Sequence, residues 1–221
     1  MVILSAYYNV KWGGIALRER TYQELFWEGE FGDSYIQRNS EGLLASKINL
    51  FTKIFSRTSG EVRSVLEFGA NIGLNLQAIS CLYPSMDITA VEINQKAFYQ
   101  LNELDYVNAH KASIFDFEPS KLYDFVFTSG MLIHINPSLL HDAYDKIYYT
   151  SSKYIMLFEY YNPTPVEVNY RGNTQVLFKR DFAGELLDRF SDLLLIDYGF
   201  IYHRDNNFPL DDGTWFLLEK V

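Results

Sequence analysis

Residues 65–73, which read VLEFGANIG, decide the fold of this chain. The run before Gly69 is apolar apart from Glu67, which is typical of a buried strand over residues 63–68. Gly69 and Gly73 punctuate the following turn, and a helix is expected to begin near Gly73. Such a turn lets backbone N–H groups approach a ligand, and the helix end offers unpaired donors. The stretch therefore predicts a site for a nucleotide-like ligand.

Strand and helix patterns alternate along the rest of the chain. Apolar residues at helical spacing predict helices over residues 41–57, 74–83, 95–104, 137–147 and 181–190. Apolar or β-branched runs predict further strands at residues 87–92, 106–114, 122–128, 154–159, 193–202 and 214–219. The alternation indicates a Rossmann-like, doubly wound, mostly parallel seven-stranded sheet in an α/β fold. The short connection at residues 205–213 predicts that the last two strands form a C-terminal antiparallel hairpin.

The composition predicts a single domain of 221 residues, with residues 1–60 as an N-terminal helical lid region and 61–221 as the core. A net charge of −9 argues against a nucleic-acid partner, because binding phosphates requires clustered Lys and Arg. We expect no signal peptide, no membrane span and a cytoplasmic location. The single cysteine, Cys81, is predicted to be a buried thiol on a helix. No histidine stands at metal-ligand spacing, so no metal site is expected.

The turn does not match the dinucleotide pattern G-x-G-x-x-G. Glu67 precedes its first glycine by two residues and would disfavour a pyrophosphate. Glu92 ends the second predicted strand, where a carboxylate can accept hydrogen bonds from two ribose hydroxyls. A ligand with an amine and a ribose is favoured, and S-adenosylmethionine has both.

With this turn and these two acidic residues, the sequence resembles the class I S-adenosylmethionine-dependent methyltransferases. Their first motif has an acidic residue, any residue, and then Gly-x-Gly-x-Gly. This chain matches it at Glu67, Gly69 and Gly73 and departs from it at Asn71. Because Asn tolerates left-handed backbone angles, we expect the turn to survive, with the Asn71 amide free to touch the ligand. The stretch SGMLIH at residues 129–134 resembles the loop beneath the transferred methyl group in that family.

A narrower resemblance covers nearly the whole chain. FWEGEFGDSYIQRN at residues 26–39 is similar to the N-terminal signature of methyltransferases from pseudaminic acid biosynthesis gene clusters. Later blocks of that family resemble EYYNPTP (159–165), YRG (170–172), LFKRDFAG (177–184) and DDGTWFLLEK (211–220). The resemblance implies methyl transfer to O or N of a small molecule, a nonulosonic (pseudaminic) acid or an amino-sugar precursor.

The cofactor residues expected from motif and resemblance together are Tyr35, Arg38, Glu67, Gly69, Asn71, Gly73, Glu92, Ile93, Ser113, Ile114 and Ser129. Residues 31–39 are interpreted as a lid, with Arg38 pairing the cofactor carboxylate, or else as an arm packed on the surface. The resemblance implies that Ser113 and Ile114 flank the adenine, although an ordinary turn and core residue would look the same.

His134 follows the fourth predicted strand and is a candidate general base or, equally, a packed and hydrogen-bonded residue. The expected substrate contacts are Tyr160, Tyr161, Tyr170, Arg171 and Arg180, and the alternative is an aromatic loop with packed rings. Two other functions stay open: methylation of a protein side chain, and a cofactor-binding but inactive regulatory subunit, which the Asn71 departure suggests. The sequence says nothing about oligomeric state.

Overall fold

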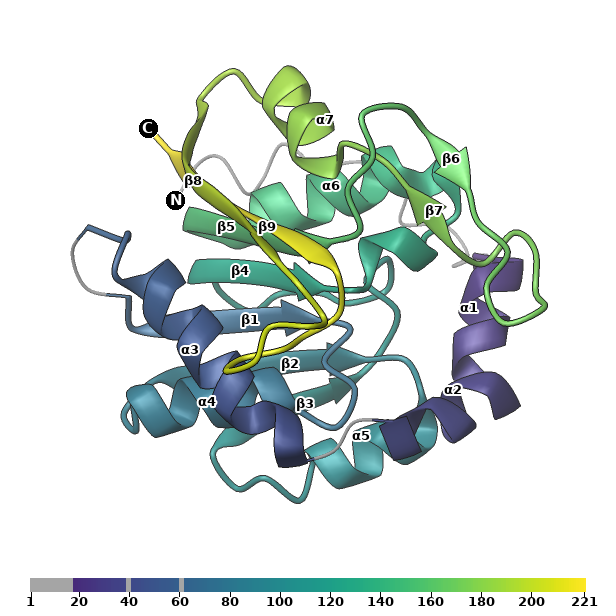
Figure 1. The fold of residues 1–221 in the computed structure, drawn as a ribbon, viewed down its shortest axis with the longest axis horizontal. Coiled ribbons are helices and arrows are strands. Elements are labelled where there is room, and N and C mark those ends of the chain that lie inside the picture. Colours follow the sequence, from purple (N-terminus) through teal and green to yellow (C-terminus); the bar gives the residue numbers. More distant parts are fainter. Residues whose placement is uncertain (1–17, 39–40, 60–61) are drawn as a thin grey trace.

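The computed structural model describes residues 18–38, 41–59 and 62–221 (Figure 1). Its main sheet has seven strands in the order β3-β2-β1-β4-β5-β9-β8. Their bounds are β1 Ser64–Phe68, β2 Asp87–Glu92, β3 Val107–Lys111, β4 Tyr123–Ser129, β5 Ser151–Glu159, β8 Leu193–Ile201 and β9 Gly213–Lys220. Strands β1 to β5 pair in parallel, whereas β9 pairs antiparallel with β5 and β8. The predicted Rossmann-like sheet and its C-terminal antiparallel hairpin are confirmed.

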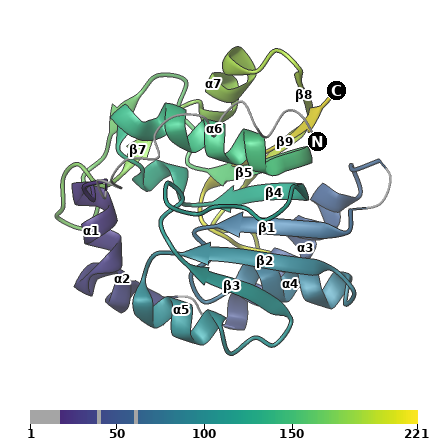
Figure 2. The ribbon, with the colours of Figure 1, turned by 180° about the vertical axis from the view of Figure 1, so that it is seen from behind.

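Helices cover both faces of this sheet (Figure 2). Val65 of β1 belongs to the core formed with α3 (Leu44–Phe55) and α4 (Leu74–Leu82). The next residue, Leu66, belongs to the opposite core, formed with α6 (Leu140–Thr150) and α7 (Phe182–Arg189). Because both faces are covered, β1 is apolar on both sides except at its first residue, Ser64, and at Glu67. No helix in the described ranges is both long and apolar enough to cross a membrane.

Two short helices precede this core: α1 (Tyr22–Glu28) and α2 (Glu30–Tyr35). Thr21 and Glu24 form a capping box at the start of α1, and Gly29 separates the two helices. In Figure 1 this pair, the α1–α2 arm, lies beyond the carboxyl ends of the parallel strands. Single turns follow at η1 (Ile36–Arg38) and η2 (Glu41–Leu43). Residues 1–17, 39–40 and 60 of the predicted lid region lie outside the described part.

Some elements differ from the sequence-based expectation. Helix α5 (Gln95–Leu101) ends three residues before the predicted end at Leu104. Two-residue strands β6 (Val166–Glu167) and β7 (Phe178–Lys179) form a small separate sheet where we predicted only loops. Strands of this length contain too few residues for an alternating pattern to be visible. Two turns, η3 (Leu132–His134) and η4 (Pro137–Leu139), connect β4 to α6.

The prediction that Cys81 is buried is wrong, because its thiol is exposed. Helix α4 buries the face that carries Leu74, Ala78 and Ile79. Cys81 lies in the last turn of α4, next to Leu82 but about 100° around the helix from it at 3.6 residues per turn, so the two side chains face different surroundings. Its exposure carries no information about the redox compartment.

Substitution of Gly73, which has a positive φ angle, tests whether packing constrains the turn. Gly73 (φ +82°) and Gly130 (φ +68°) are both left-handed, but a Cβ on Gly73 would meet Leu101 and Leu104 at 2.8 and 2.9 Å. A Cβ on Gly130 would meet no atom within 4 Å. We expect Gly73→Ala to lower the free energy of unfolding by about 2–3 kcal/mol and Gly130→Ala by about 1 kcal/mol in urea titrations. Equal losses would show that packing against α5 does not constrain the turn.

Candidate active site

A cavity of about 560 Å³ lies at the carboxyl ends of β1, β2 and β4, beneath the α1–α2 arm. Parallel α/β sheets bind their ligands at this edge. Most of the residues predicted for the site line it: Tyr35, Glu67, Gly69, Asn71, Glu92, Ile93, Ser113, Ile114, Ser129, His134, Tyr160, Tyr170 and Arg171.

Three predicted residues stand apart from this lining, and the side-chain position of a fourth, Arg38, is not described. Gly73 packs behind the turn, and Tyr161 is 43% exposed beside Phe216. The Arg180 guanidinium pairs with Glu185 at 2.7 Å, which directs it to α7 instead of the cavity. Arg38 ends η1, but its side chain lies outside the described part of the chain.

The turn after β1 is tied to the end of β2 by its own backbone. The amides of Gly69 and Ala70 both donate to the Val91 carbonyl, at 2.8 and 3.2 Å. Asn71 has a φ of +50°, which is the left-handed conformation expected for the residue that replaces the middle glycine. Its side-chain oxygen Oδ1 is buried and has no hydrogen-bond partner among the described residues. The turn therefore keeps its shape and presents an amide oxygen at the cavity.

Glu92 is buried at the end of β2 and organises both sides of the cavity. Its Oε2 accepts from the Asn71 amide at 2.7 Å, and its Oε1 accepts from the Asn94 amide at 2.6 Å. Burial raises the pKa of Glu92, while these hydrogen bonds oppose the rise. Each carboxylate oxygen keeps lone-pair capacity for a further donor, so two neighbouring hydroxyls can bind here.

Glu67 forms a buried polar chain with two residues that the sequence analysis missed. Its Oε1 accepts from Asn75 Nδ2 at 2.6 Å, and Asn75 Oδ1 accepts from Lys47 Nζ at 2.7 Å. Burial raises the pKa of Glu67 to about 8 and lowers the pKa of Lys47. Glu67 Oε2 has no hydrogen-bond partner among the described residues. The chain thus joins α3, α4 and β1 and leaves an acidic oxygen facing the cavity.

Glu159, also missed, fixes the loop after β4. Its carboxylate accepts from Thr128 Oγ1 at 2.8 Å and from the amides of Met131, Leu132 and Ile133 at 3.1–3.3 Å. Burial raises its pKa to about 7 in spite of these four bonds. The carboxylate acts as a cap for η3, so it holds the loop that carries Ser129 and His134.

His134 lies in this loop with its ring packed against aromatic side chains. Its Nδ1 is 2.5 Å from the Val176 carbonyl, so Nδ1–H donates and Nε2 retains a lone pair. Burial lowers the pKa of His134 to about 4, which keeps the ring neutral near pH 7. Trp27 lies 4.3 Å and Tyr170 5.6 Å from its ring centre. The geometry is that of a packed, hydrogen-bonded imidazole with little basicity.

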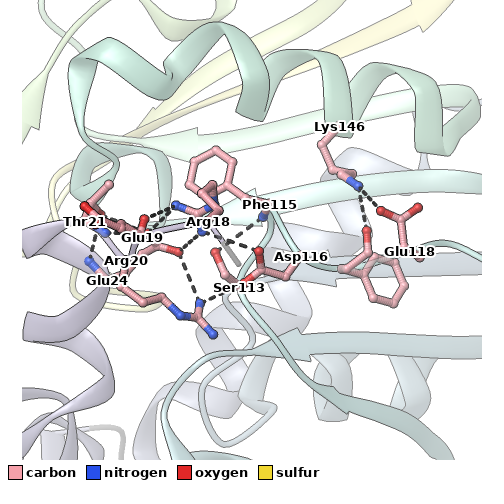
Figure 3. Close-up of polar contacts among 11 residues, drawn as sticks. Arg18, Glu19, Arg20, Thr21, Glu24, Ser113, Phe115, Asp116, Glu118 and Lys146 are labelled. Atoms are coloured by element: carbon pink, nitrogen blue, oxygen red, sulfur yellow. Dashed lines mark hydrogen bonds and ion pairs between the residues drawn. The ribbon is translucent and has the colours of Figure 1, made fainter. Parts of the chain in front are cut away.

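The α1–α2 arm is held over the cavity by polar contacts. Glu24 accepts from Arg18 at 2.5 and 2.8 Å and from Arg20 at 3.2 Å, and Arg20 also pairs with Asp116 at 3.0 Å (Figure 3). Burial opposes ionisation of Glu24, but hydrogen bonds from Arg18, Ser113 and the Thr21 backbone hold its pKa at about 2. The charged cluster therefore joins the start of the arm to the loop after β3.

The far end of the arm contacts the loop after β2. Asn94 Nδ2 donates to the Trp27 carbonyl at 3.2 Å and to Asp33 at 3.0 Å, while Oδ1 of Asn94 caps α5. A Cβ on Gly32 would meet the Trp27 carbonyl oxygen at 1.9 Å, so this position has no room for a larger residue. Phe31 of α2 also packs against Tyr170, with 5.9 Å between ring centres.

Comparisons with solved structures give the fold of this chain. The plantazolicin methyltransferase BpumL, bound to a monoazolic desmethylPZN analog and SAH (S-adenosylhomocysteine), has a TM-score of 0.64 at 14% identity over 89% of this chain and 93% of its own. The glycopeptide N-methyltransferase MtfA with SAH has a TM-score of 0.62 at 13% identity, covering 88% and 99%.

A third neighbour is the 1,6-didemethyltoxoflavin-N1-methyltransferase of Burkholderia thailandensis, with a TM-score of 0.64 at 13% identity over 86% of this chain and 83% of that one. No protein-family model and no curated protein matches the sequence. The chain therefore has the fold of class I methyltransferases.

The buried carboxyl of Glu67 makes stability depend on pH. Its pKa is raised above the unfolded value, so its contribution to stability is complete below about pH 4 and is lost as pH rises through 8. Glu67→Gln keeps an oxygen for Asn75 and removes this loss. We expect the variant to be more stable than wild type by about 1–2 kcal/mol at pH 9 and equal to it at pH 4 in urea titrations. A difference that does not change with pH would contradict this account.

Proposed function

We propose that this protein is an S-adenosylmethionine-dependent methyltransferase. The observation that carries the proposal is the pair of buried carboxyls, Glu67 and Glu92, on the two sides of the left-handed turn at the sheet edge. Solved neighbours with the same fold contain SAH. When bound, the cofactor would supply an electrophilic methyl group on a sulfonium.

The residues of the cavity fit this cofactor. Glu92 would accept the two ribose hydroxyls, and Ser113 and Ile114 would flank the adenine. The unpartnered oxygens of Glu67 and Asn71 suit the amino group, since both are buried acceptors at the turn. Lys47 lines the same cavity, donates to Asn75 next to Glu67, and would pair with the cofactor carboxylate, the role that the sequence suggested for Arg38.

Burial disfavours the charged forms of Glu67 and Lys47, because it raises the first pKa and lowers the second. A zwitterionic amino-acid end would oppose both shifts, since its ammonium favours ionised Glu67 and its carboxylate favours protonated Lys47. A neutral ligand would oppose neither shift.

We further propose that the N-terminal region acts as a lid over the core formed by residues 61–221. The cluster at Glu24, the contacts of Asn94 and the packing of Trp27 on His134 support this role for the α1–α2 arm. Water excluded from the cavity would strengthen the electrostatic contacts there and prevent hydrolysis. Glu159 would hold the loop beneath the methyl group, which carries Ser129.

The acceptor is proposed to be a small molecule that reacts at O or N, and the narrower sequence resemblance favours a nonulosonic acid or an amino-sugar precursor. The aromatic wall of the cavity, with half-buried Tyr160 and Tyr170, supports a small acceptor. Arg171 lines the same cavity and would pair with an anionic group of the acceptor. The hypothesis of an inactive regulatory subunit was based on Asn71 in place of the middle glycine. Because Asn71 keeps the turn intact, this replacement does not favour that hypothesis.

Titration calorimetry with S-adenosylmethionine, SAH and NAD tests the cofactor. We expect SAH to bind and NAD not to bind. Glu92→Ala should weaken the binding of SAH and of 5′-methylthioadenosine alike by about 10–100-fold, because both ligands carry the ribose. Binding of NAD alone would contradict the proposal.

Lys47→Met distinguishes the two ends of the cofactor. We expect it to weaken the binding of SAH by about 10-fold or more and to leave the affinity for 5′-methylthioadenosine unchanged, since that ligand lacks the amino-acid end. Lys53→Met on the same helix α3 is the matched control and should change neither affinity. An equal loss for both ligands would show that Lys47 acts through the fold and not through the cofactor carboxylate.

A further inference from the structure

We propose that the methyl acceptor is an amine, bound as a cation by Asp211 and a wall of tyrosines in the part of the cavity beside β5 and β9. This inference rests on the proposed methyltransferase function and adds to it the chemical class of the acceptor. It has its own test, in which cofactor binding is measured separately.

Asp211 supplies the negative charge. It belongs to the loop between β8 and β9, lines the cavity, and its Oδ2 accepts a hydrogen bond from the Tyr160 hydroxyl at 3.3 Å. The other carboxyl in this region, Glu159, is already bonded to Thr128 and three backbone amides. Asp211 is therefore the carboxylate in this part of the described cavity that remains able to hold a ligand.

Phenol rings converge on the same place. Burial, the charge of Asp211 and the nearby hydroxyls of Tyr35 and Tyr170 all raise the pKa of Tyr160. Tyr35 and Tyr170 also line the cavity, and Tyr170 packs against the neutral ring of His134. Ring faces attract organic cations, and a carboxylate beside them adds a direct charge partner.

Two basic side chains of the protein itself lie over the rings of these tyrosines. The Nζ of Lys179 lies 5.1 Å from the ring centre of Tyr160, and the Cζ of Arg171 lies 5.8 Å from that of Tyr170. Arg180, which follows Lys179, is instead paired with Glu185. The tyrosines therefore already act as cation partners on the rim of the cavity.

The available proton acceptors favour nitrogen over oxygen. A hydroxyl acceptor needs a strong base, but burial lowers the pKa of His134 to about 4, and Tyr160 is a donor whose pKa is raised. An ammonium needs only to lose one proton to solvent, and the cavity is open to solvent beside Asp211, which is exposed. The neutral nitrogen then attacks with its lone pair. The new N–C bond forms as the C–S bond breaks, and that electron pair stays on sulfur, giving SAH and a protonated methylamine.

The test uses wild-type protein, isotopically labelled S-adenosylmethionine and pairs of compounds that differ only in amine or hydroxyl. Suitable pairs are glucosamine 6-phosphate with glucose 6-phosphate, glycine with glycolate, and a nucleotide-linked 4-amino-4,6-dideoxy sugar with its 4-hydroxy analogue. Mass spectrometry should detect methylation of an amine member at a rate at least 10-fold above its partner. Methylation of a hydroxyl member at an equal or higher rate overturns the inference, and so does the absence of methylation of every amine.

Asp211→Asn should reduce the amine-to-hydroxyl ratio of kcat/KM at least 10-fold, and a change in SAH affinity does not alter this ratio because both acceptors react with the same cofactor. The matched control is Asp212→Asn, since Asp212 pairs with His203 and stands outside the cavity lining. An unchanged ratio in Asp211→Asn overturns the inference even though SAH binds. If SAH fails to bind wild type, the methyltransferase proposal itself fails, and the two failures are thereby distinguished.

Discussion

The hydrogen bond from the Asn71 amide to the Glu92 carboxylate joins the two strand ends on which the site is built. It forms because Asn71 adopts a left-handed conformation, and because Gly69 and Ala70 bond to the Val91 carbonyl next to it. Without this connection, the turn after β1 and the acid after β2 would move independently. The cavity edge would then lose its fixed geometry.

The same region concentrates groups that weaken the fold. Glu67, Glu92 and Glu159 are all buried carboxyls whose pKa values are raised by burial. Buried ionisable groups seldom add stability, and retaining several at one edge is typical of a site in which binding or positioning is selected over stability. Glu159 serves the loop after β4, whereas Glu67 and Glu92 present oxygens to the cavity, so their roles differ although their environments are similar.

Much of the fold was predictable because it depends on local patterns. Residues close together in the sequence are enough to predict the strand before Gly69, the turn between the two glycines and the alternation of strands with helices. The β6–β7 sheet was missed because its strands have two residues each. Cys81 was assigned to the wrong face because Leu82 beside it is apolar, although adjacent helical positions point about 100° apart.

The site was harder to predict because its partners are distant in sequence. Glu159 caps a loop that begins 28 residues earlier, and Asp211 reaches Tyr160 from a hairpin 51 residues later. Lys47 could have been found from the sequence. It falls three residues after Leu44 on an apolar helix face, where a lysine is unusual. Arg180 was assigned to the substrate from its place in the chain, but the structure pairs it with Glu185.

A crystal structure of the protein with SAH tests the central claim most directly. The account predicts the ribose hydroxyls within hydrogen-bond distance of Glu92 and the amino-acid end between Glu67 and Lys47. SAH bound with its ribose away from Glu92, or bound outside the cavity beneath the α1–α2 arm, would contradict it.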